Sequence, residues 1–278
     1  MDDRDFAWLR GFLRERAGLL LDDDKAYLAK FRLEPLAQRE GFSSLSSMIA
    51  QLSAAPSNGL HARTLEAMTI NETSFFRDAH PFEALRTRIL PELLELRREE
   101  RRLVLWSAAC ASGQEPYSLA MLLSDQFAGV LAGWEVRLVG SDLASATIDR
   151  ARAGLYSQLE VNRGLPASCL LNHFEKEGLD WRIRPEIRKR VELQVLNLLD
   201  DWAGLPAPDV ILLRNALIYM AEDVRRSILA RIRRFLRPGG VLLLGAAETI
   251  LGQEAEFERV QFGTCCAYRA VPPGENAR

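Results

Sequence analysis

The sequence predicts an α/β protein in which a mostly parallel sheet is covered by helices on both faces. From Leu103 onward, short apolar runs alternate with helical segments, which is typical of a parallel sheet buried on both sides. Roughly the first 70 residues show helical periodicity only. With 278 residues, 48% of them hydrophobic and 27% charged, the chain has the length and composition of one large globular domain or two ordinary ones.

Composition and charge exclude several classes of protein. The net charge of −2 is far from the basic excess typical of nucleic-acid binders. Apolar runs such as Val241–Leu244 are much shorter than the roughly 18 residues of a membrane helix, so we expect no membrane insertion. The acidic segment 1–5 lacks the pattern of a secretory signal, which predicts a cytoplasmic protein. The four cysteines do not have metal-ligand spacing, so we expect no metal.

The N-terminal region is predicted to form amphipathic helices. The apolar residues at helical spacing are Phe6, Leu9 and Leu13 in a first helix and Leu28, Phe31 and Leu36 in a second. Segment 43–52 has the pattern of a further short helix. The second helix carries a local group of basic residues, namely Lys25, Lys30, Arg32 and Arg39. Charge patterning alone favours a solvated helix face for them.

The remaining elements follow in order after the N-terminal helices. We predict core strands at residues 103–107, 136–139, 191–195, 209–213 and 241–244, and a C-terminal hairpin at 257–261 and 265–268. Helices are predicted from residue 116, at 144–153 and at 222–236, and the tail 272–276 is expected to be disordered. An open sheet that ends in a hairpin is the layout of Rossmann-like methyltransferases. In such folds the ligand lies beyond the carboxyl ends of the strands.

The first strand is followed by a run of small residues, 108–113, which would let a ligand approach the backbone and the helix that begins after it. The run lacks the glycine patterns of dinucleotide and triphosphate sites, which argues against both ligands. Glu115 favours a cationic ligand, although a carboxylate at this position could equally cap the helix.

Polar residues also follow the other strands. Asp142 comes directly after the second strand, where a carboxylate can accept hydrogen bonds from both ribose hydroxyls of an adenosine ligand or can cap the next helix. Asn197 and Leu198 follow the third strand, and Arg214 and Asn215 follow the fourth. Because these strand ends meet at one edge of the sheet, we expect them to form one site.

Six ordered segments of the chain resemble the CheR-type chemoreceptor glutamate methyltransferases, which use S-adenosylmethionine. The segments are residues 73–78, 106–118, 140–142 with 151–156, 197–199, 214–220, and 236–240 with Glu248. The resemblance implies a helical N-terminal domain at 1–70 and a class I methyltransferase domain at 71–278. It also implies a small antiparallel β-subdomain at about 172–191, with its strand at 181–184.

The resemblance assigns roles to individual residues. It places cofactor contacts at Asn71, Thr73, Arg77, Glu115, Asp142, Asn197, Leu198, Arg214 and Asn215. It implies that Arg77 and Tyr219 lie beside the transferred methyl group and the substrate carboxylate, as the catalytic residues. It also implies that Lys25, Lys30, Arg32 and Arg39 contact the receptor, in contrast to the solvated face favoured above.

The expected reaction is in-line displacement at a sulfonium methyl by a receptor glutamate, which gives a methyl ester and S-adenosylhomocysteine. A glutamate of pKa about 4.3 is ionised at neutral pH, so no general base is needed. Arg77 would orient the carboxylate, and Tyr219 would donate a further hydrogen bond. The expected partner is the cytoplasmic helical region of chemoreceptors.

A few departures from the family pattern affect pocket packing and partner binding. Gln114, Ala216 and Met220 replace the more usual residues of the pocket. Segment 174–181 is shorter than the loop of relatives that bind a receptor pentapeptide, so we expect no such tether. We expect a monomer.

Three alternatives remain open. The same fold could methylate another protein or a small molecule. A non-catalytic cofactor-binding signalling module would predict loss of Arg77 or Tyr219, but both are present. A nucleic-acid methyltransferase is disfavoured by the charge and by the sequence 214–217 after the fourth strand.

Overall fold

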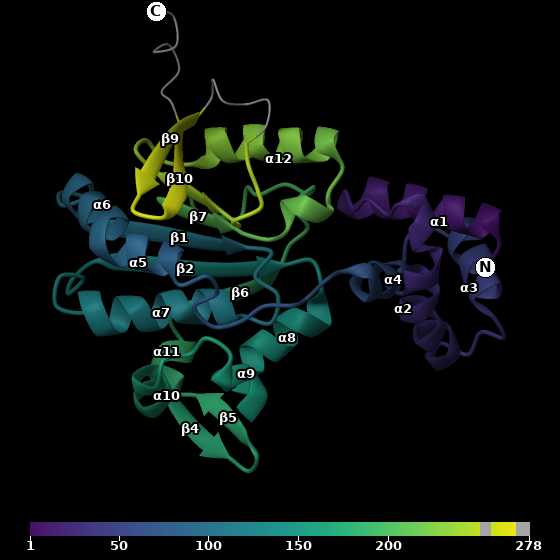
Figure 1. Ribbon diagram of the computed structural model, residues 1–278, viewed down its shortest axis with the longest axis horizontal. Helices are drawn as coiled ribbons and strands as arrows, with labels where there is room; N and C mark the ends of the chain where they lie inside the picture. The colour runs from purple at the N-terminus through teal and green to yellow at the C-terminus, as the bar shows by residue number, and fades with distance from the viewer. Residues whose placement is uncertain (251–256, 271–278) are drawn as a thin grey trace, which may run out of the picture.

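The computed structural model describes residues 1–250 and 257–270, which form a helical N-terminal part, a large sheet with its helices, and a small second sheet (Figure 1). The tail 272–276, for which composition predicts disorder, lies outside the described residues. No helix in the described ranges is long and apolar enough to span a bilayer.

The N-terminal part contains four α-helices, whose ends follow from local capping. These are α1 (Asp3–Ala17), α2 (Ala26–Arg39), α3 (Leu45–Ala54) and α4 (Gly59–Met68), with a 3₁₀ turn at Asp23–Lys25 before α2. Asp2 and Ser44 form capping boxes at the starts of α1 and α3, and Gly18 ends α1 in the left-handed conformation. The helices bury a core of their own around Leu9, Leu33 and Met48.

Helix α2 packs with a different face from the predicted one. Leu36 is buried, but Phe31 is 77% exposed, and Ala29 and Leu33 are fully buried instead. Positions 29, 33 and 36 share one face at 3.6 residues per turn, whereas position 31 lies on the other side. The prediction for Phe31 was therefore wrong, because helical spacing does not say which of two apolar faces of α2 is turned inward.

In the described part of the chain, seven strands form the large sheet, in the order β6-β2-β1-β7-β8-β10-β9. The strands are β1 (Arg102–Ala108), β2 (Glu135–Asp142), β6 (Val191–Val195), β7 (Val210–Leu213), β8 (Val241–Leu244), β9 (Phe257–Phe262) and β10 (Cys265–Ala270). The first five are parallel, and β10 pairs antiparallel with β8 and β9. The predicted fold class, a Rossmann-like methyltransferase sheet with a C-terminal hairpin, is confirmed.

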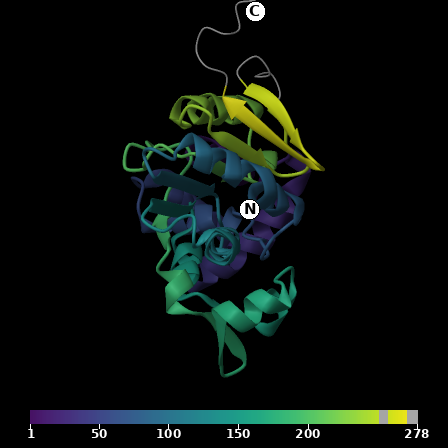
Figure 2. The same cartoon turned by 90° about the vertical axis from the view of Figure 1, so that its left-hand side faces the viewer.

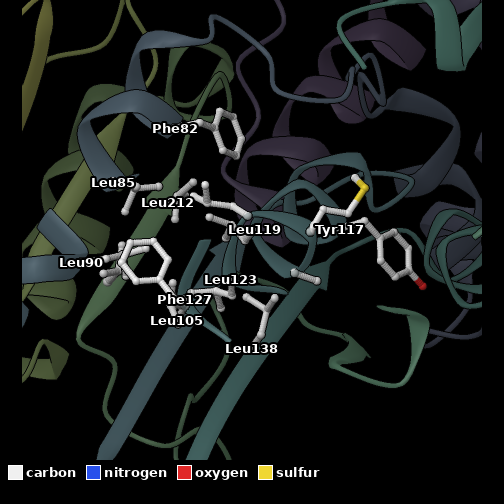
Figure 3. Close-up of a cluster of buried hydrophobic side chains, with 14 of the residues drawn as sticks. Phe82, Leu85, Leu90, Leu105, Tyr117, Leu119, Leu123, Phe127, Leu138 and Leu212 are labelled. Carbon is white, nitrogen blue, oxygen red and sulfur yellow. The ribbon is translucent and has the colours of Figure 1, made fainter. Parts of the chain in front are cut away.

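Successive strand residues face opposite sides of the sheet, and both sides are covered. Leu105 and Leu212 pack into one cluster with α5 (His80–Ala84), the π-turn Leu85–Ile89, α6 (Leu90–Leu96) and α7 (Gln114–Phe127), as Figure 3 shows. Trp106 and Leu213 pack on the opposite side with α12 (Glu222–Phe235). This two-sided burial explains why the core strands are nearly continuous apolar runs.

A small antiparallel sheet projects from the large one, as Figures 1 and 2 show. Its strands are β3 (Leu155–Tyr156), β4 (Phe174–Glu177) and β5 (Asp180–Ile183), in the order β3-β5-β4. The short helices around it are α8 (Ser145–Ala153), α9 (Gln158–Asn162), α10 (Ala167–His173) and α11 (Pro185–Arg188). Strand β5 covers most of the strand predicted at 181–184, and β3 extends the sheet upstream of residue 172.

Candidate active site

The carboxyl edge of the large sheet faces the N-terminal helices across a cavity of about 300 Å³. Strands β1 and β2 point toward these helices in Figure 1. The sheet side of the cavity includes Asp142, Leu196, Asn197, Leu198 and Asn215, and the helical side includes Leu13, Ala17, Leu28, Lys25 and Arg32. A cavity of this size at strand ends, with mainly apolar walls and a few polar groups, is suited to a small organic ligand.

Asp142 ends β2 with its carboxylate buried at the cavity. Its Oδ2 accepts a hydrogen bond from the Ala111 N–H at 2.9 Å, and its Oδ1 accepts one from the Ala144 N–H at 3.0 Å. Burial raises the pKa of this carboxyl, although the backbone hydrogen bonds act to lower it. Each oxygen keeps a lone pair, so the ionised group can accept further hydrogen bonds from a ligand.

The loop after β1 is shaped for close backbone approach. Ala109 and Ala111 have φ values of 55° and 48°, and Gly113 has a φ of 90°. A Cβ on Gly113 would lie 2.8 Å from the Cβ of Ala151, so only glycine fits there. The loop thus brings its backbone to the cavity beside Asp142.

Arg214 follows β7 and joins three segments beneath the cavity. Its side chain is 1% exposed, and it donates to Glu115 Oε2 at 2.8 Å and to Asp78 Oδ2 at 2.7 Å. The same guanidinium donates to the backbone oxygen of Arg77 at 2.9 Å, and the second Glu115 oxygen accepts from Ser107 Oγ at 2.8 Å. The Arg214 side chain therefore supports the site from below.

Asn215 presents an unsatisfied acceptor at the cavity. Its φ is 60°, and its Oδ1 is buried without a hydrogen-bond partner in the part of the chain that the structure describes. A buried amide oxygen of this kind favours a donor from a ligand, such as an ammonium group.

Glu248 holds the loop that carries Asn215. Its Oε2 accepts from the N–H groups of Asn215 at 2.7 Å and Gly245 at 2.8 Å, and its Oε1 accepts from the Ile218 N–H at 3.2 Å. A Cβ on Gly245 would lie 2.7 Å from the Glu248 carboxylate, so glycine leaves room for it. Glu248 ends the sixth segment of the family resemblance, and an acid shortly after a buried strand is the signal in the sequence for its role.

Arg77 lies in a segment of unusual backbone conformation. Phe76, Asp78 and Ala79 have φ values of 46°, 64° and 32°. Such conformations cost about 1–3 kcal/mol each in non-glycine residues and persist where surrounding structure enforces them. Within residues 1–250 and 257–270, the guanidinium of Arg77 makes one hydrogen bond, from Nη1 to the backbone oxygen of Glu72 at 3.1 Å. Its other donors are available to a ligand.

Tyr219 lines the cavity from the 3₁₀ turn Leu217–Tyr219. Its backbone oxygen accepts from the Leu20 N–H at 2.8 Å, and the Ala221 N–H donates to the Gly18 oxygen at 3.0 Å. Leu19 and Met220 form an antiparallel bridge between these two bonds. The connection between α1 and α2 is thereby fixed to the loop that carries Tyr219.

The N-terminal helices also contact other strand-end loops. Asn197 Nδ2 donates to the backbone oxygen of Arg16 at 2.6 Å. Glu66 accepts from the backbone N–H and the hydroxyl of Ser145 at 2.6 and 2.7 Å, at the start of α8. The helical domain therefore forms one wall of the cavity.

The four basic residues of the second helix divide into two pairs. Lys25 and Arg32 line the cavity, and Arg32 donates to the backbone oxygens of Met68 and Thr69 at 2.7 and 3.1 Å. Lys30 and Arg39 are exposed on the outer surface.

The predicted cofactor contacts also divide. Asn71, Asp142, Asn197, Leu198 and Asn215 line the cavity, whereas Thr73, Arg77, Glu115 and Arg214 are not part of its wall. Glu115 and Arg214 are tied together beneath the cavity, and the Arg77 backbone is tied to Arg214. No group of three or more possible metal ligands occurs among the residues that the structure describes.

The sheet topology and the cavity at its carboxyl edge are those of the Rossmann-like methyltransferase class. Residues 71–266 match the CheR methyltransferase SAM-binding domain, and residues 4–69 match the CheR methyltransferase all-alpha domain. The chain belongs to the CheR methyltransferase family.

Similar proteins carry related names. Chemotaxis protein methyltransferase 1 of Pseudomonas aeruginosa is 41% identical over 96% of this chain and 97% of its own length. Chemotaxis protein methyltransferase Cher2 of Pseudomonas putida is 38% identical over 96% of this chain and 98% of its own length. The chemotaxis protein methyltransferase of Vibrio anguillarum is 35% identical over 97% of this chain and 98% of its own length.

The cavity residues fit S-adenosylmethionine. Asp142 can accept from ribose hydroxyls, and Leu196 and Leu198 offer apolar surface for an adenine. The unpartnered Oδ1 of Asn215 can accept from the amino group of the methionine part.

Proposed function

We propose that this methyltransferase modifies side-chain carboxylates of specific glutamates in the cytoplasmic helical region of chemoreceptors. The products are glutamyl methyl esters and S-adenosylhomocysteine, and the reaction serves adaptation in a chemosensory pathway. Relatives that match nearly the whole chain are named chemotaxis protein methyltransferases, which supports a receptor substrate. The observation that carries the proposal is Arg77, whose backbone oxygen is bonded to Arg214 and whose guanidinium makes one hydrogen bond within the described ranges.

The chain's residues need only position the reactants. Bound S-adenosylmethionine supplies an electrophilic methyl group on a sulfonium. A glutamate of pKa about 4.3 is already ionised at neutral pH, so no side chain has to remove a proton. Alignment and exclusion of water are the remaining contributions, and the helical wall of the cavity serves both.

Arg77 orients the acceptor carboxylate. Its planar guanidinium presents donors that match the two oxygens of a carboxylate. One donor is engaged by Glu72, and the side chain is partly exposed, so the ion pair with an incoming glutamate is moderate. A moderate pair holds the carboxylate in place without strongly reducing its nucleophilicity. Tyr219, which lines the cavity, donates a further hydrogen bond from its hydroxyl.

The nine cofactor positions act in two ways in this proposal. The cavity-lining residues Asn71, Asp142, Asn197, Leu198 and Asn215 contact the cofactor. The side chains of Glu115 and Arg214 hold the loops that present these groups, and Thr73 and Arg77 belong to the segment next to them. Asp142 receives the ribose, and Asn197 and Leu198 lie at the adenine.

The helical domain, residues 1–70, faces the receptor, and residues 71–278 form the catalytic domain. Lys30 and Arg39 are exposed on α2, where they can attract an acidic receptor surface. Lys25 and Arg32 would contact only a receptor side chain that reaches the cavity. We further propose that the protein is a cytoplasmic monomer. We also propose that it binds receptors without a pentapeptide tether, since β4 and β5 are joined by the short turn at Gly178 and Leu179.

The test is methyl transfer from labelled S-adenosylmethionine to receptor-containing membranes of the source organism. Mild alkali then hydrolyses esters and releases the label as volatile methanol, whereas N-methyl products keep it. Release from the wild type but not from an Arg77→Ala variant would support the proposal. Label that survives alkali would overturn the assignment of glutamate as the acceptor. Label released from a protein other than a receptor would overturn the proposal that chemoreceptors are the substrate.

A further inference from the structure

The small sheet β3-β5-β4 and the helices α9 and α10 together form the β-subdomain of this chain, residues 155–183. One of its glycines lies directly against the segment that carries Arg77. Gly164, in the connection between α9 and α10, has a φ of 86°. A Cβ at this position would lie 2.2 Å from the backbone oxygen of Phe75 and 3.4 Å from its carbonyl carbon. Because the obstructing atoms are backbone, they cannot rotate aside as a side chain would. Both the conformation and the space therefore require glycine.

The side chain of Phe75 is held by the small sheet. Phe75 is fully buried, and its ring makes edge contacts with Tyr156 of β3 and Phe174 of β4, at centroid distances of 5.0 and 5.5 Å. These rings come from the two outer strands of the sheet. The hydroxyl of Tyr156 also donates to the Ser112 oxygen in the loop after β1. The small sheet thus fixes the ring that lies two residues before Arg77.

An ion pair between Arg163 and Glu72 links the β-subdomain to the residue that bonds the Arg77 guanidinium. Arg163 Nη2 lies 2.7 Å from Glu72 Oε1, and the Arg163 guanidinium holds the pKa of that carboxyl below its ordinary value. The backbone oxygen of Glu72 accepts the hydrogen bond from Arg77 Nη1. Arg163 therefore fixes the side chain of Glu72, the residue whose backbone oxygen accepts the hydrogen bond from Arg77.

The other side of the segment is held by the main domain. Ser118 Oγ accepts from the Phe76 N–H at 2.9 Å, and Arg214 donates to the Arg77 oxygen and the Asp78 carboxylate. The left-handed residues next to Arg77 therefore lie between two supports, one from the main domain and one from the β-subdomain.

We propose that the β-subdomain positions Arg77 for methyl transfer, with Gly164 and Arg163 as positioning residues. The inference rests on the role of Arg77 in the proposed function. It assigns to this subdomain a task inside the catalytic domain: it keeps Phe75 and Glu72 in place, so that the guanidinium meets the acceptor carboxylate in one orientation.

The decisive variant is Gly164→Ala, with Gly178→Ala as its matched control. Both glycines belong to the β-subdomain and have left-handed φ values, but a Cβ on Gly178 would meet nothing within 4 Å. We expect Gly164→Ala to lower kcat for methyl transfer to receptor membranes about tenfold, since one misplaced group can cost this much. The Kd for S-adenosylhomocysteine should stay within about twofold of wild type, because four of the five cavity-lining cofactor residues, all except Asn71, lie on other elements. Gly178→Ala should change neither.

A second set of variants guards against a general folding defect. Arg163→Glu and Glu72→Arg should each lower kcat about threefold, and the double variant should recover most of the loss because the pair is restored with reversed charges. Hydrogen exchange of residues 72–79 adds a readout that needs no acceptor. Exchange there should become faster in Gly164→Ala and stay at the wild-type rate in Gly178→Ala.

Equal kcat in the two glycine variants, or no recovery in the double variant, would overturn the inference. A parallel loss of kcat and of S-adenosylhomocysteine affinity in Gly164→Ala would also overturn it, because the effect would not be specific to Arg77. The proposed function fails separately, when Arg77→Ala itself leaves kcat unchanged.

Discussion

Two arginines that touch at the site are used in opposite ways. The side chain of Arg214 is 1% exposed and bonds to two carboxylates and one backbone oxygen. Arg77 provides that backbone oxygen, but its own partly exposed guanidinium bonds only to Glu72 within the described ranges. Arg214 is thus a structural part of the site, whereas the guanidinium of Arg77 has donors available to a ligand.

The difference has a physical basis in desolvation. A buried guanidinium is tolerated when its charge is paired. Both terminal nitrogens of Arg214 bond to protein groups, and its Nε is buried without a partner in the described part of the chain, so Arg214 has little capacity left for a substrate. A partly exposed guanidinium can exchange water for a carboxylate at low cost. Motif position alone does not distinguish the two, since both arginines fall in segments that resemble the same family.

The largest effect is expected from removing Arg214, the arginine that pairs with two carboxylates. Arg214→Met leaves Glu115 and Asp78 without their common partner, and breaking a buried pair costs about 3–5 kcal/mol. The free energy of unfolding, measured by urea denaturation, should fall by that amount. Arg98→Met, which breaks an exposed ion pair with Glu95, is the control and should cost less than about 1 kcal/mol. Similar losses in the two variants would contradict the assigned role of Arg214.

The next largest effect is expected at Asp142. Asp142→Asn should weaken S-adenosylhomocysteine binding about 100-fold, because the amide loses charge-assisted acceptance and faces a backbone N–H with its own donor. Isothermal titration calorimetry of the variant and of wild type at neutral pH measures the difference.

The same carboxyl predicts a pH dependence. Burial raises its pKa, so it takes up a proton at a higher pH than a free aspartate would. The protonated form is the weaker acceptor, so wild-type affinity for S-adenosylhomocysteine should fall on acidification, and the fall should begin at a higher pH than the titration of a free aspartate would give. Asp142→Asn should show no such fall, and a parallel decline in both proteins would exclude Asp142 as the titrating group.

Arg77→Ala should show the opposite pattern to Asp142→Asn. We expect kcat to fall about 30-fold, the range for loss of a charged hydrogen bond, while the Kd for S-adenosylhomocysteine remains near that of wild type. Receptor methylation and calorimetry measure the two quantities. If affinity falls as much as kcat, Arg77 belongs with the structural residues such as Arg214.

The smallest effect is expected at the surface. Lys30→Glu together with Arg39→Glu should raise the KM for receptor membranes about fivefold at low salt, and less at high salt, because exposed charges mainly steer encounter. Lys189→Glu together with Arg190→Glu, two exposed residues after α11, makes the same charge change elsewhere and should have little effect. A rise in KM that is independent of salt would point to direct contact instead.

Much of the fold follows from the sequence, for reasons that particular elements show. Strands β6 and β8 begin and end where the sequence predicts. Strand β8 is a fully buried apolar run between two glycines, whereas β6 is an edge strand in which Val191, Leu193 and Val195 alternate with polar residues. Strand β3 was missed because it has two residues and exists only through its pairing with β5. Phe31 was misplaced because helical spacing does not say which of two apolar faces is turned inward.

The site was predictable where topology determines it. Asp142 and Asn215 line the cavity because they directly follow parallel strands. The opposition of Gly164 and Phe75, and the turn of Arg32 toward the end of α4, depend on tertiary contacts between distant segments. No periodicity or spacing in the sequence encodes such contacts.

The bridge between Leu19 and Met220 bears on how the two domains could be recombined. Its hydrogen bonds are all between backbone groups, so they would survive almost any exchange of side chains. The exception is Gly18, whose φ is 68° and whose added Cβ would lie 2.6 Å from Val224 Cγ1. In a chimera that joins the helical domain of one relative to the catalytic domain of another, this bridge should therefore form, provided that the first domain has glycine at position 18 and the second has valine at position 224.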